Sequence, residues 1–127
     1  MDGVRTLRIG IASAGSIRKR TLEIARGAKL QPGEPKLWIS SFESLSKVLS
    51  EKNILLLEMI RSSQPKSMSA LAKTAGRKAS NLSRTLHAME RLGLVRFEQW
   101  QGRKIPVVVY DRVRLECTLG SVTGKAA

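Results

Sequence analysis

The sequence predicts an α+β protein in which a strand-helix-strand segment precedes four helices and a β-hairpin. Three observations support this prediction. Apolar and polar residues alternate in Val4–Ile11, which is typical of a half-buried strand. Between positions 41 and 92 the apolar residues recur every three or four positions, as in helices packed on a common core. After Gly93 the pattern returns to that of strands, and Gly102 interrupts it as a turn residue does.

Residues 1–40 are expected to form a strand-helix-strand extension. The alternating segment 4–11 is the first strand, with its apolar side chains on one face. A helix is predicted over 16–28, where apolar residues recur at helical spacing. The segment 31–35, rich in proline and glycine, ends it, and Leu37–Ile39 is expected to return as a short strand.

Two helices are predicted to follow. Ser40 and Glu43 have the spacing of a capping box, which places a helix over about 41–50. The next helix, over 51–62, is apolar nearly all round, so we expect it to be the most buried helix of the protein. Pro65 separates it from the third.

A short turn is predicted to link the third helix, 67–75, to a fourth over 79–92. Gly76 accepts the left-handed backbone conformation that ends a helix. The fourth helix has one apolar face, which is expected to point into the core. That face consists of Leu82, Leu86 and Met89.

Residues 94–110 are expected to form a hairpin. Its strands are rich in Val and aromatic residues, and Gln101-Gly102-Arg103-Lys104 is predicted to be the connecting turn, with its two cations at the tip. A last strand follows, in which apolar residues alternate with charged ones, and Leu7–Ile11 is a candidate pairing partner for it. Residues 41–119 are thus assigned to one domain, and 120–127 to a flexible tail.

Composition indicates a polyanionic partner. The 127 residues include 23 Lys and Arg against 10 Asp and Glu, giving a net charge of +13. The basic residues are spread along the chain, which favours a folded basic surface over a basic arm. The single cysteine excludes an internal disulfide, and no apolar run approaches the roughly 20 residues of a membrane span. We therefore expect a cytoplasmic protein that does not enter a membrane.

The outer face of helix 79–92 predicts contact with double-stranded DNA. Arginine reaches guanine bidentately, asparagine pairs with adenine, and serine bonds phosphate. Lys78 stands where a helix prefers Ser, Asp or Asn, and a phosphate would relieve its charge against the helix dipole. Base readout is expected from Ser80, Asn81, Arg84 and His87. Phosphate contacts are expected from Lys73, Arg77, Lys78 and Ser83, with Arg103 and Lys104 contacting the backbone or the neighbouring groove.

The order of helices, turn and hairpin resembles the winged helix-turn-helix of MarR-like and ArsR-like bacterial regulators. The residues that carry the resemblance are Leu71-Ala72 through Gly76, Asn81-Leu82-Ser83-Arg84-Thr85-Leu86, Met89-Glu90 and Gly93-Leu94-Val95. The whole chain is also similar to small DNA-binding regulators and antitoxin-like proteins of bacteria and archaea, through the segments Ser41–Leu45 and Tyr110–Arg114.

The resemblance implies a transcriptional regulator, a repressor or autoregulator that binds its site as a homodimer. It implies as an alternative an antitoxin-type protein that neutralises a small toxin through residues 1–40. The remaining alternative is a protein that binds nucleic acid without sequence preference. Lys78 departs from the resemblance, since those proteins usually have Ser or Thr at this cap.

No catalytic, metal or cofactor site is predicted. His87 and Cys117 are the only histidine and cysteine, too few ligands for zinc. Cys117 shares the apolar face of its strand, which predicts a buried thiol rather than a nucleophile. Aromatic residues make up 4% of the chain, which argues against a base-stacking platform for RNA.

Overall fold

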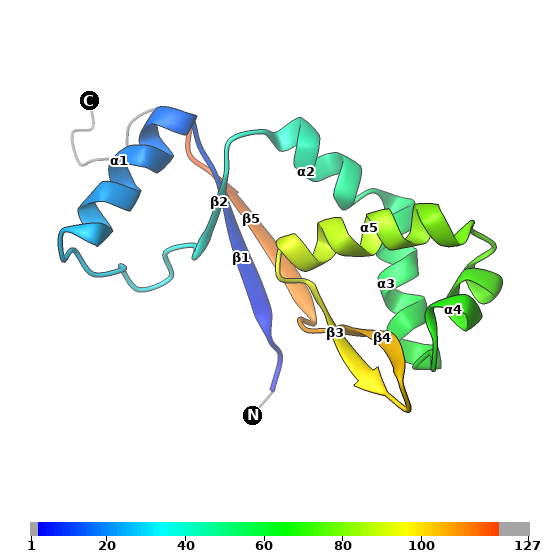
Figure 1. The fold of residues 1–127 in the computed structure, drawn as a ribbon. Helices are drawn as coiled ribbons and strands as arrows, with labels where there is room; N and C mark the ends of the chain where they lie inside the picture. Colours follow the sequence, from blue (N-terminus) through cyan, green and yellow to red (C-terminus); the bar gives the residue numbers. More distant parts are fainter. Residues whose placement is uncertain (1–2, 120–127) are drawn as a thin grey trace. The chain divides into compact units, whose positions relative to one another are not determined.

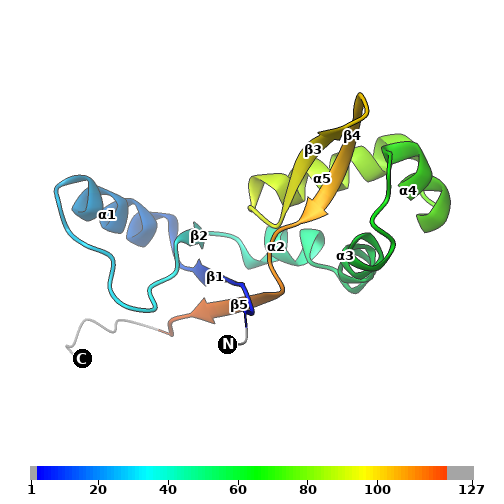
Figure 2. The ribbon, with the colours of Figure 1, turned by 90° about the horizontal axis from the view of Figure 1, so that it is seen from below.

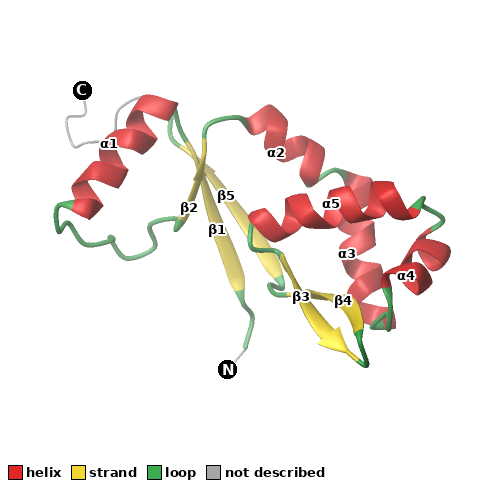
Figure 3. Ribbon diagram, in the orientation of Figure 1, coloured by secondary structure: helices red, strands yellow, loops and turns green. Residues whose placement is uncertain are grey.

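The computed structural model describes residues 3–119 and shows an α+β fold (Figure 3). Within that range the chain forms five helices and two small sheets, one of them a two-stranded hairpin (Figure 1). None of the helices in this range is long and apolar enough to cross a membrane. The predicted tail, 120–127, lies outside the described residues.

The chain divides into two compact units. The N-terminal unit comprises residues 6–45 together with the segment from Arg112, and the larger unit comprises 46–111 with the residues before Thr6. This division differs from the predicted one, which placed 41–119 together. The physical reason is that the last strand pairs with the first strand rather than with the hairpin.

The N-terminal unit is a three-stranded parallel sheet with one helix. Strand β1 (Thr6–Ile11), helix α1 (Ala14–Ala25) and strand β2 (Leu37–Ile39) form the predicted strand-helix-strand segment. The last strand, β5 (Arg112–Cys117), pairs with the other edge of β1, so the strand order is β2-β1-β5. Both edge strands run parallel to β1 (Figure 1).

The centre of this sheet is closely packed. Leu7 and Ile9 are 7% and 0% exposed and form its apolar core. On the other face the ring of Trp38 lies directly over Gly10, so that a Cβ at this position would come within 2.4 Å of the ring. Gly10 therefore allows the close approach of the indole to the strand.

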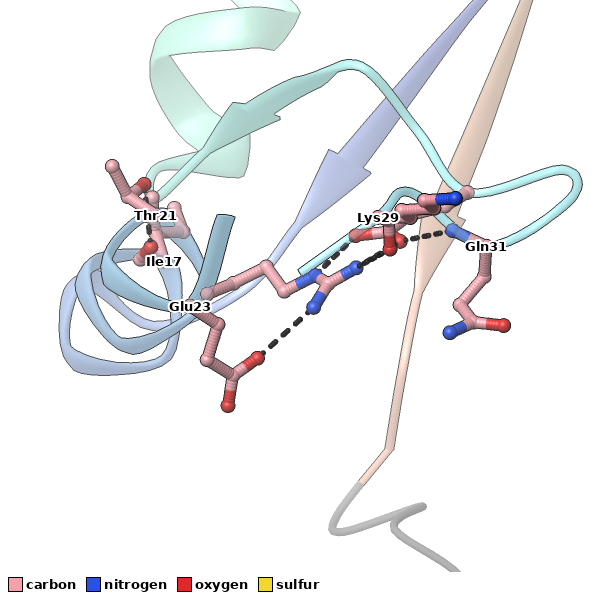
Figure 4. Close-up of polar contacts among 7 residues, drawn as sticks. Ile17, Thr21, Glu23, Lys29 and Gln31 are labelled. Carbon is pink, nitrogen blue, oxygen red and sulfur yellow. Dashed lines mark hydrogen bonds and ion pairs between the residues drawn. The ribbon is translucent and has the colours of Figure 1, made fainter. Parts of the chain in front are cut away.

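Helix α1 is held by polar contacts, since none of its side chains is buried. The Arg20 guanidinium binds both carboxylate oxygens of Glu34 at 2.7 Å and also donates to the backbone oxygen of Lys29. Glu34 in turn accepts from the Gln31 N–H at 2.8 Å, and Arg20 contacts Glu23 at 3.0 Å (Figure 4). This network fastens the segment after α1 to the helix.

Acid should weaken the N-terminal unit through this network. The hydrogen bonds from Arg20 hold the pKa of Glu34 below its ordinary value of 4.5. A carboxyl with a lowered pKa in the folded state contributes stability that is present above its ordinary pKa and is lost as the pH falls through the lowered value. We therefore expect Glu34→Gln to lower the melting temperature at pH 7 and to flatten its fall between pH 5 and pH 3. Glu58→Gln, at an exposed carboxyl of another helix, is the control; equal acid sensitivity of Glu34→Gln and wild type would contradict this account.

The larger unit contains three complete helices and the hairpin, and its first residues end a fourth helix. The elements are α2 (Phe42–Val48), α3 (Glu51–Ser63), α4 (Met68–Ala75), α5 (Ala79–Arg91), β3 (Val95–Trp100) and β4 (Arg103–Val108). Serines cap the first three helices by accepting backbone N–H groups: Ser41 from Ser44, Ser50 from Asn53 and Ser67 from Ala70. The cap of α2 is thus Ser41, one residue after the predicted Ser40.

The core of the larger unit lies between α5 and its neighbours. The predicted inward face of α5 is confirmed, since its three apolar residues are fully buried. The hairpin packs on the helices, with β3 against α5 and β4 against α3 and α4 (Figures 1 and 2). The buried apolar residues of this unit are Leu56, Ile60, Leu71, Leu82, Leu86, Met89, Leu94 and Val95.

Two burial predictions were wrong. Helix α3 is not the most buried helix, because Ile54 and Leu55 are 44% and 57% exposed. So few elements surround α3 that only one side of the helix is covered. Cys117 is exposed rather than buried. Cys117 lies on the edge strand β5, and the buried residues Leu7 and Ile9 lie on the central strand β1.

Candidate nucleic-acid interface

The turn between α4 and α5 has a defined geometry. Gly76 adopts φ 67° and ψ 33°, the left-handed conformation predicted for it. Its N–H donates to the Lys73 carbonyl, and the Arg77 N–H donates to the Ala72 carbonyl at 3.1 Å, which is the Schellman pattern. The chain leaves α4 through this motif and enters α5 two residues later.

The outward face of α5 consists of unpaired polar side chains. Ser80, Asn81 and Arg84 are all exposed. Within residues 3–119 their side chains form no hydrogen bond or ion pair, and the same is true of Lys73 on α4. These groups are therefore available to a ligand without breaking a contact of the protein.

The charge around this face has one sign. From Glu58 to Glu90 the intervening sequence contains no acidic residue. It contains six cations, which lie on α3, the α3–α4 loop, α4, the α4–α5 turn and α5: Arg61, Lys66, Lys73, Arg77, Lys78 and Arg84. Of these six, Lys73, Lys78 and Arg84 are exposed on α4, the turn and α5, where they favour a polyanion.

The first turn of α5 lacks a side-chain cap. Lys78 is the N-cap residue, with an extended backbone, and its side chain accepts no hydrogen bond. The first backbone N–H groups of a helix have no partner within the helix, and they carry the positive end of its dipole. An anion such as phosphate satisfies both conditions. The prediction that α5 starts without a side-chain cap is therefore confirmed.

His87 lies between α5 and the hairpin. Its Nδ1 is 2.7 Å from the Ser83 carbonyl oxygen, its Nε2 is 3.3 Å from Lys104 Nζ, and its ring centroid is 5.1 Å from that of Phe97. The neutral Nδ1–H tautomer fits all of these contacts, since it donates to Ser83 and accepts from the ammonium group. His87 thus joins the helix to the hairpin, and its polar atoms are already engaged.

The hairpin turn is tighter than the predicted four residues. Gln101 and Gly102 have φ values of 51° and 74°, and Trp100 pairs with Arg103, which defines a two-residue turn. Arg103 and Lys104 therefore lie in β4, where successive side chains point to opposite faces. Lys104 lies over the Phe97 ring, 4.3 Å from its centroid. Arg103 is exposed and unpaired within the described residues.

A hollow of about 460 Å³ connects α4 with the hairpin. Its lining includes the N-terminal residues Ser67 and Ser69 of the α4 region and the two cations Arg103 and Lys104. Hydroxyls, a helix N-terminus and cations together favour phosphate oxygens. These two serines were not among the predicted site residues. The signal that marks them is the start of a helix two residues after Pro65, with Ser67 as its N-cap.

Arg77 is directed toward the protein. Its Nη2 donates to the Lys52 carbonyl oxygen on α3 at 3.2 Å, and the side chain is half-buried. This contact fastens the turn before α5 to α3. Arg77 is thus less available to a ligand than Lys78 beside it, which is exposed and unpaired within the described part of the chain.

A second hollow does not offer a comparable site. It has a volume of about 620 Å³ and lies between α3 and β4, with Trp100 on its wall. Its three cations are engaged. Arg61 forms an ion pair with Asp111, and Arg5 and Lys66 lie 5.6 and 5.4 Å from the ring centroids of Tyr110 and Trp100. In contrast, Lys73, Lys78 and Arg84 on the α4–α5 surface are unpaired within residues 3–119.

The structure thus defines an α+β protein with an exposed basic helix surface beside a hairpin. The chain belongs to the HVO_A0114 family, whose model matches residues 48–115. That match covers all of α3, α4, α5 and the hairpin and extends into β5. No curated protein and no solved structure significantly matches this chain.

Proposed function

We propose that this protein is a winged helix-turn-helix regulator that binds double-stranded DNA with sequence preference. In this proposal α4 and α5 form the helix-turn-helix, α5 enters the major groove, and the β3–β4 hairpin is the wing. The observation that supports it best is the outward face of α5, where Ser80, Asn81 and Arg84 are exposed and unpaired within residues 3–119.

The side chains of this surface divide into two roles. Asn81 and Arg84 have the donor and acceptor groups that distinguish bases in the major groove, and Ser80 lies beside them. Phosphates are bound by Lys73, by Lys78 and by the unsatisfied N–H groups at the start of α5. His87 acts indirectly, because its contact with Lys104 fixes that ammonium between α5 and the hairpin.

The test is a fluorescence-anisotropy titration of the full chain against its own upstream DNA and a scrambled duplex, at two salt concentrations. A site-specific regulator should prefer its site by about 10³-fold or more. Equal affinity for both duplexes, with a steep salt dependence, would instead indicate binding without sequence preference. No binding to either would overturn the proposal.

Arg103→Ala should weaken binding to all sequences alike. A cation that contacts phosphate carries no base information, and its loss should reduce the slope of log K against log salt by about 1. The measurement is the salt dependence of affinity for cognate and scrambled duplexes. Arg96→Ala is the matched control, since Arg96 is an arginine of the same hairpin that is ion-paired with Glu98 at 2.7 Å. An unchanged slope in Arg103→Ala would remove this side chain from the interface.

The antitoxin alternative stays a prediction about residues 1–40. Leu22 and Ile24 of α1 are 47% and 39% exposed, so this helix has apolar surface for a protein partner. Such a role is compatible with DNA binding through α5, since the residues involved belong to different units.

A further inference from the structure

Strand β5 has an unpaired edge. It lies at one side of the sheet, and β1 is its only paired neighbour within residues 3–119. All six residues, Arg112–Cys117, pair with β1 without interruption, so the strand contains no bulge. It contains no proline either, and proline, like a bulge, is one of the devices that protect an edge from further pairing. Its other edge is thus a template for another strand.

The two faces of β5 differ in chemistry. One face of β5 is apolar and consists of Val113, Leu115 and Cys117. It is the same face of the sheet as that of the buried Leu7 and Ile9, because Val113 pairs with Leu7 and Leu115 with Ile9. Leu115 stands opposite Ile9 and is nevertheless 43% exposed. The apolar row of the sheet therefore continues across β5 and ends uncovered.

The charged face has an unbalanced pair. Arg114 stands directly opposite Arg8, and like charges at such positions are destabilising. Arg8 is compensated by the Gly33 carbonyl oxygen and by Glu116, whose carboxylate is 3.6 Å away. Arg114 has no hydrogen bond or ion pair within residues 3–119. An acidic group beside Arg114 on the unpaired edge of β5 would balance its charge.

We infer that β5 pairs with β5 of a second copy of this chain, antiparallel and centred on Leu115. A two-fold axis through this residue places Leu115 opposite its own copy and Val113 opposite Cys117 on the apolar face. On the other face it places Arg114 opposite Glu116, twice. The sheet then continues through the dimer as β2-β1-β5-β5-β1-β2.

Charge selects this register among the symmetric ones. Centring the pair on Arg114 or on Glu116 puts two identical charges opposite each other. Centring it on Val113 puts Arg112 opposite Arg114, again with equal charge. Only the Leu115 centre among residues 113–116 gives two opposite-charge pairs and no like-charge pair. This inference stands independently of DNA binding, since it uses only contacts within the N-terminal unit.

Cysteine cross-linking tests the register in the full chain. Directly opposed residues of antiparallel strands have Cα atoms about 4.5–5.5 Å apart, within the range of a disulfide. Leu115→Cys combined with Cys117→Ser should therefore form a covalent dimer under mild oxidation. Val113→Cys with Cys117 retained should also cross-link, through the 113–117 pair. The control, Val113→Cys with Cys117→Ser, should not, because its two thiols are four positions apart along the strands, about 14 Å.

Charge reversal tests the same contact without oxidation. Wild-type protein should sediment as a dimer at micromolar concentration. Arg114→Glu and Glu116→Arg should each weaken the dimer roughly tenfold or more, and the double variant should restore it, because the opposite-charge pairs return with exchanged signs. Circular dichroism verifies that each variant is folded. A monomeric wild type, or a dimer in which the Leu115→Cys variant does not cross-link, would overturn the inference.

Discussion

Replacing Arg84 with alanine should weaken binding to the best DNA site by about 1–3 kcal/mol, which corresponds to roughly 5- to 150-fold in affinity. Arg84 is exposed on the outward face of α5 and has no ion pair or hydrogen bond within residues 3–119. Its loss should therefore leave the fold unchanged and remove the proposed bidentate base contact. The proposed role predicts that preference between duplexes falls together with affinity. Competition of selected sites against random duplexes in anisotropy measures both.

The comparison with Arg96→Ala separates this role from bulk charge. Both variants lose one positive charge, but Arg96 is already paired with Glu98. Similar losses in the two variants would mean that Arg84 acts only through net charge. Equal losses of Arg84→Ala on cognate and random DNA would move Arg84 to the group of phosphate contacts.

Leu86→Ala should destabilise the larger unit by roughly 2–5 kcal/mol. Leu86 is 0% exposed and lies between two other fully buried residues on the inward face of α5, Leu82 and Met89. Truncation removes apolar contacts and leaves a cavity that neighbouring elements close only in part. Urea unfolding followed by circular dichroism measures the change in free energy of unfolding.

The matched control is Leu55→Ala on α3. This leucine is 57% exposed, so its truncation should change stability by no more than about 0.5 kcal/mol. The two variants make the same chemical change on two helices of similar length. If they unfold at the same urea concentration, the core face of α5 is misassigned.

Local signals predicted much of the larger unit. Gly76 adopts the left-handed conformation expected of it, and α5 begins at Ala79 as predicted. Both features depend on residues within one or two turns of the chain, where spacing and backbone preference suffice. The hairpin was also expected, although its turn contains two residues instead of four because Arg103 continues the pairing of Trp100.

Features set by distant contacts were not accessible in this way. The apolar run of α3 gave no information on how many neighbours would cover it, so the exposure of Leu55 was missed. The contacts of His87 with Lys104 and of Arg77 with the Lys52 carbonyl join separate elements. These contacts engage side chains that the helical pattern alone assigns to the exposed surface, so fewer side chains are available to a ligand than the pattern predicts.

The parallel pairing of β1 with β5 has a consequence for the order in which the protein folds during synthesis. Arg5 and Asp111, which hydrogen-bond just before these strands begin, are 106 positions apart in the chain. Translation delivers β1 first, but its second neighbour arrives only after the whole of 46–111 has been made. The contacts of α3, α4, α5 and the hairpin are closer in sequence and close smaller loops. The N-terminal unit, whose strand β1 is made before α3, α4, α5 and the hairpin, is therefore completed after them, and a nascent chain that ends before Arg112 leaves β1 with one unpaired edge.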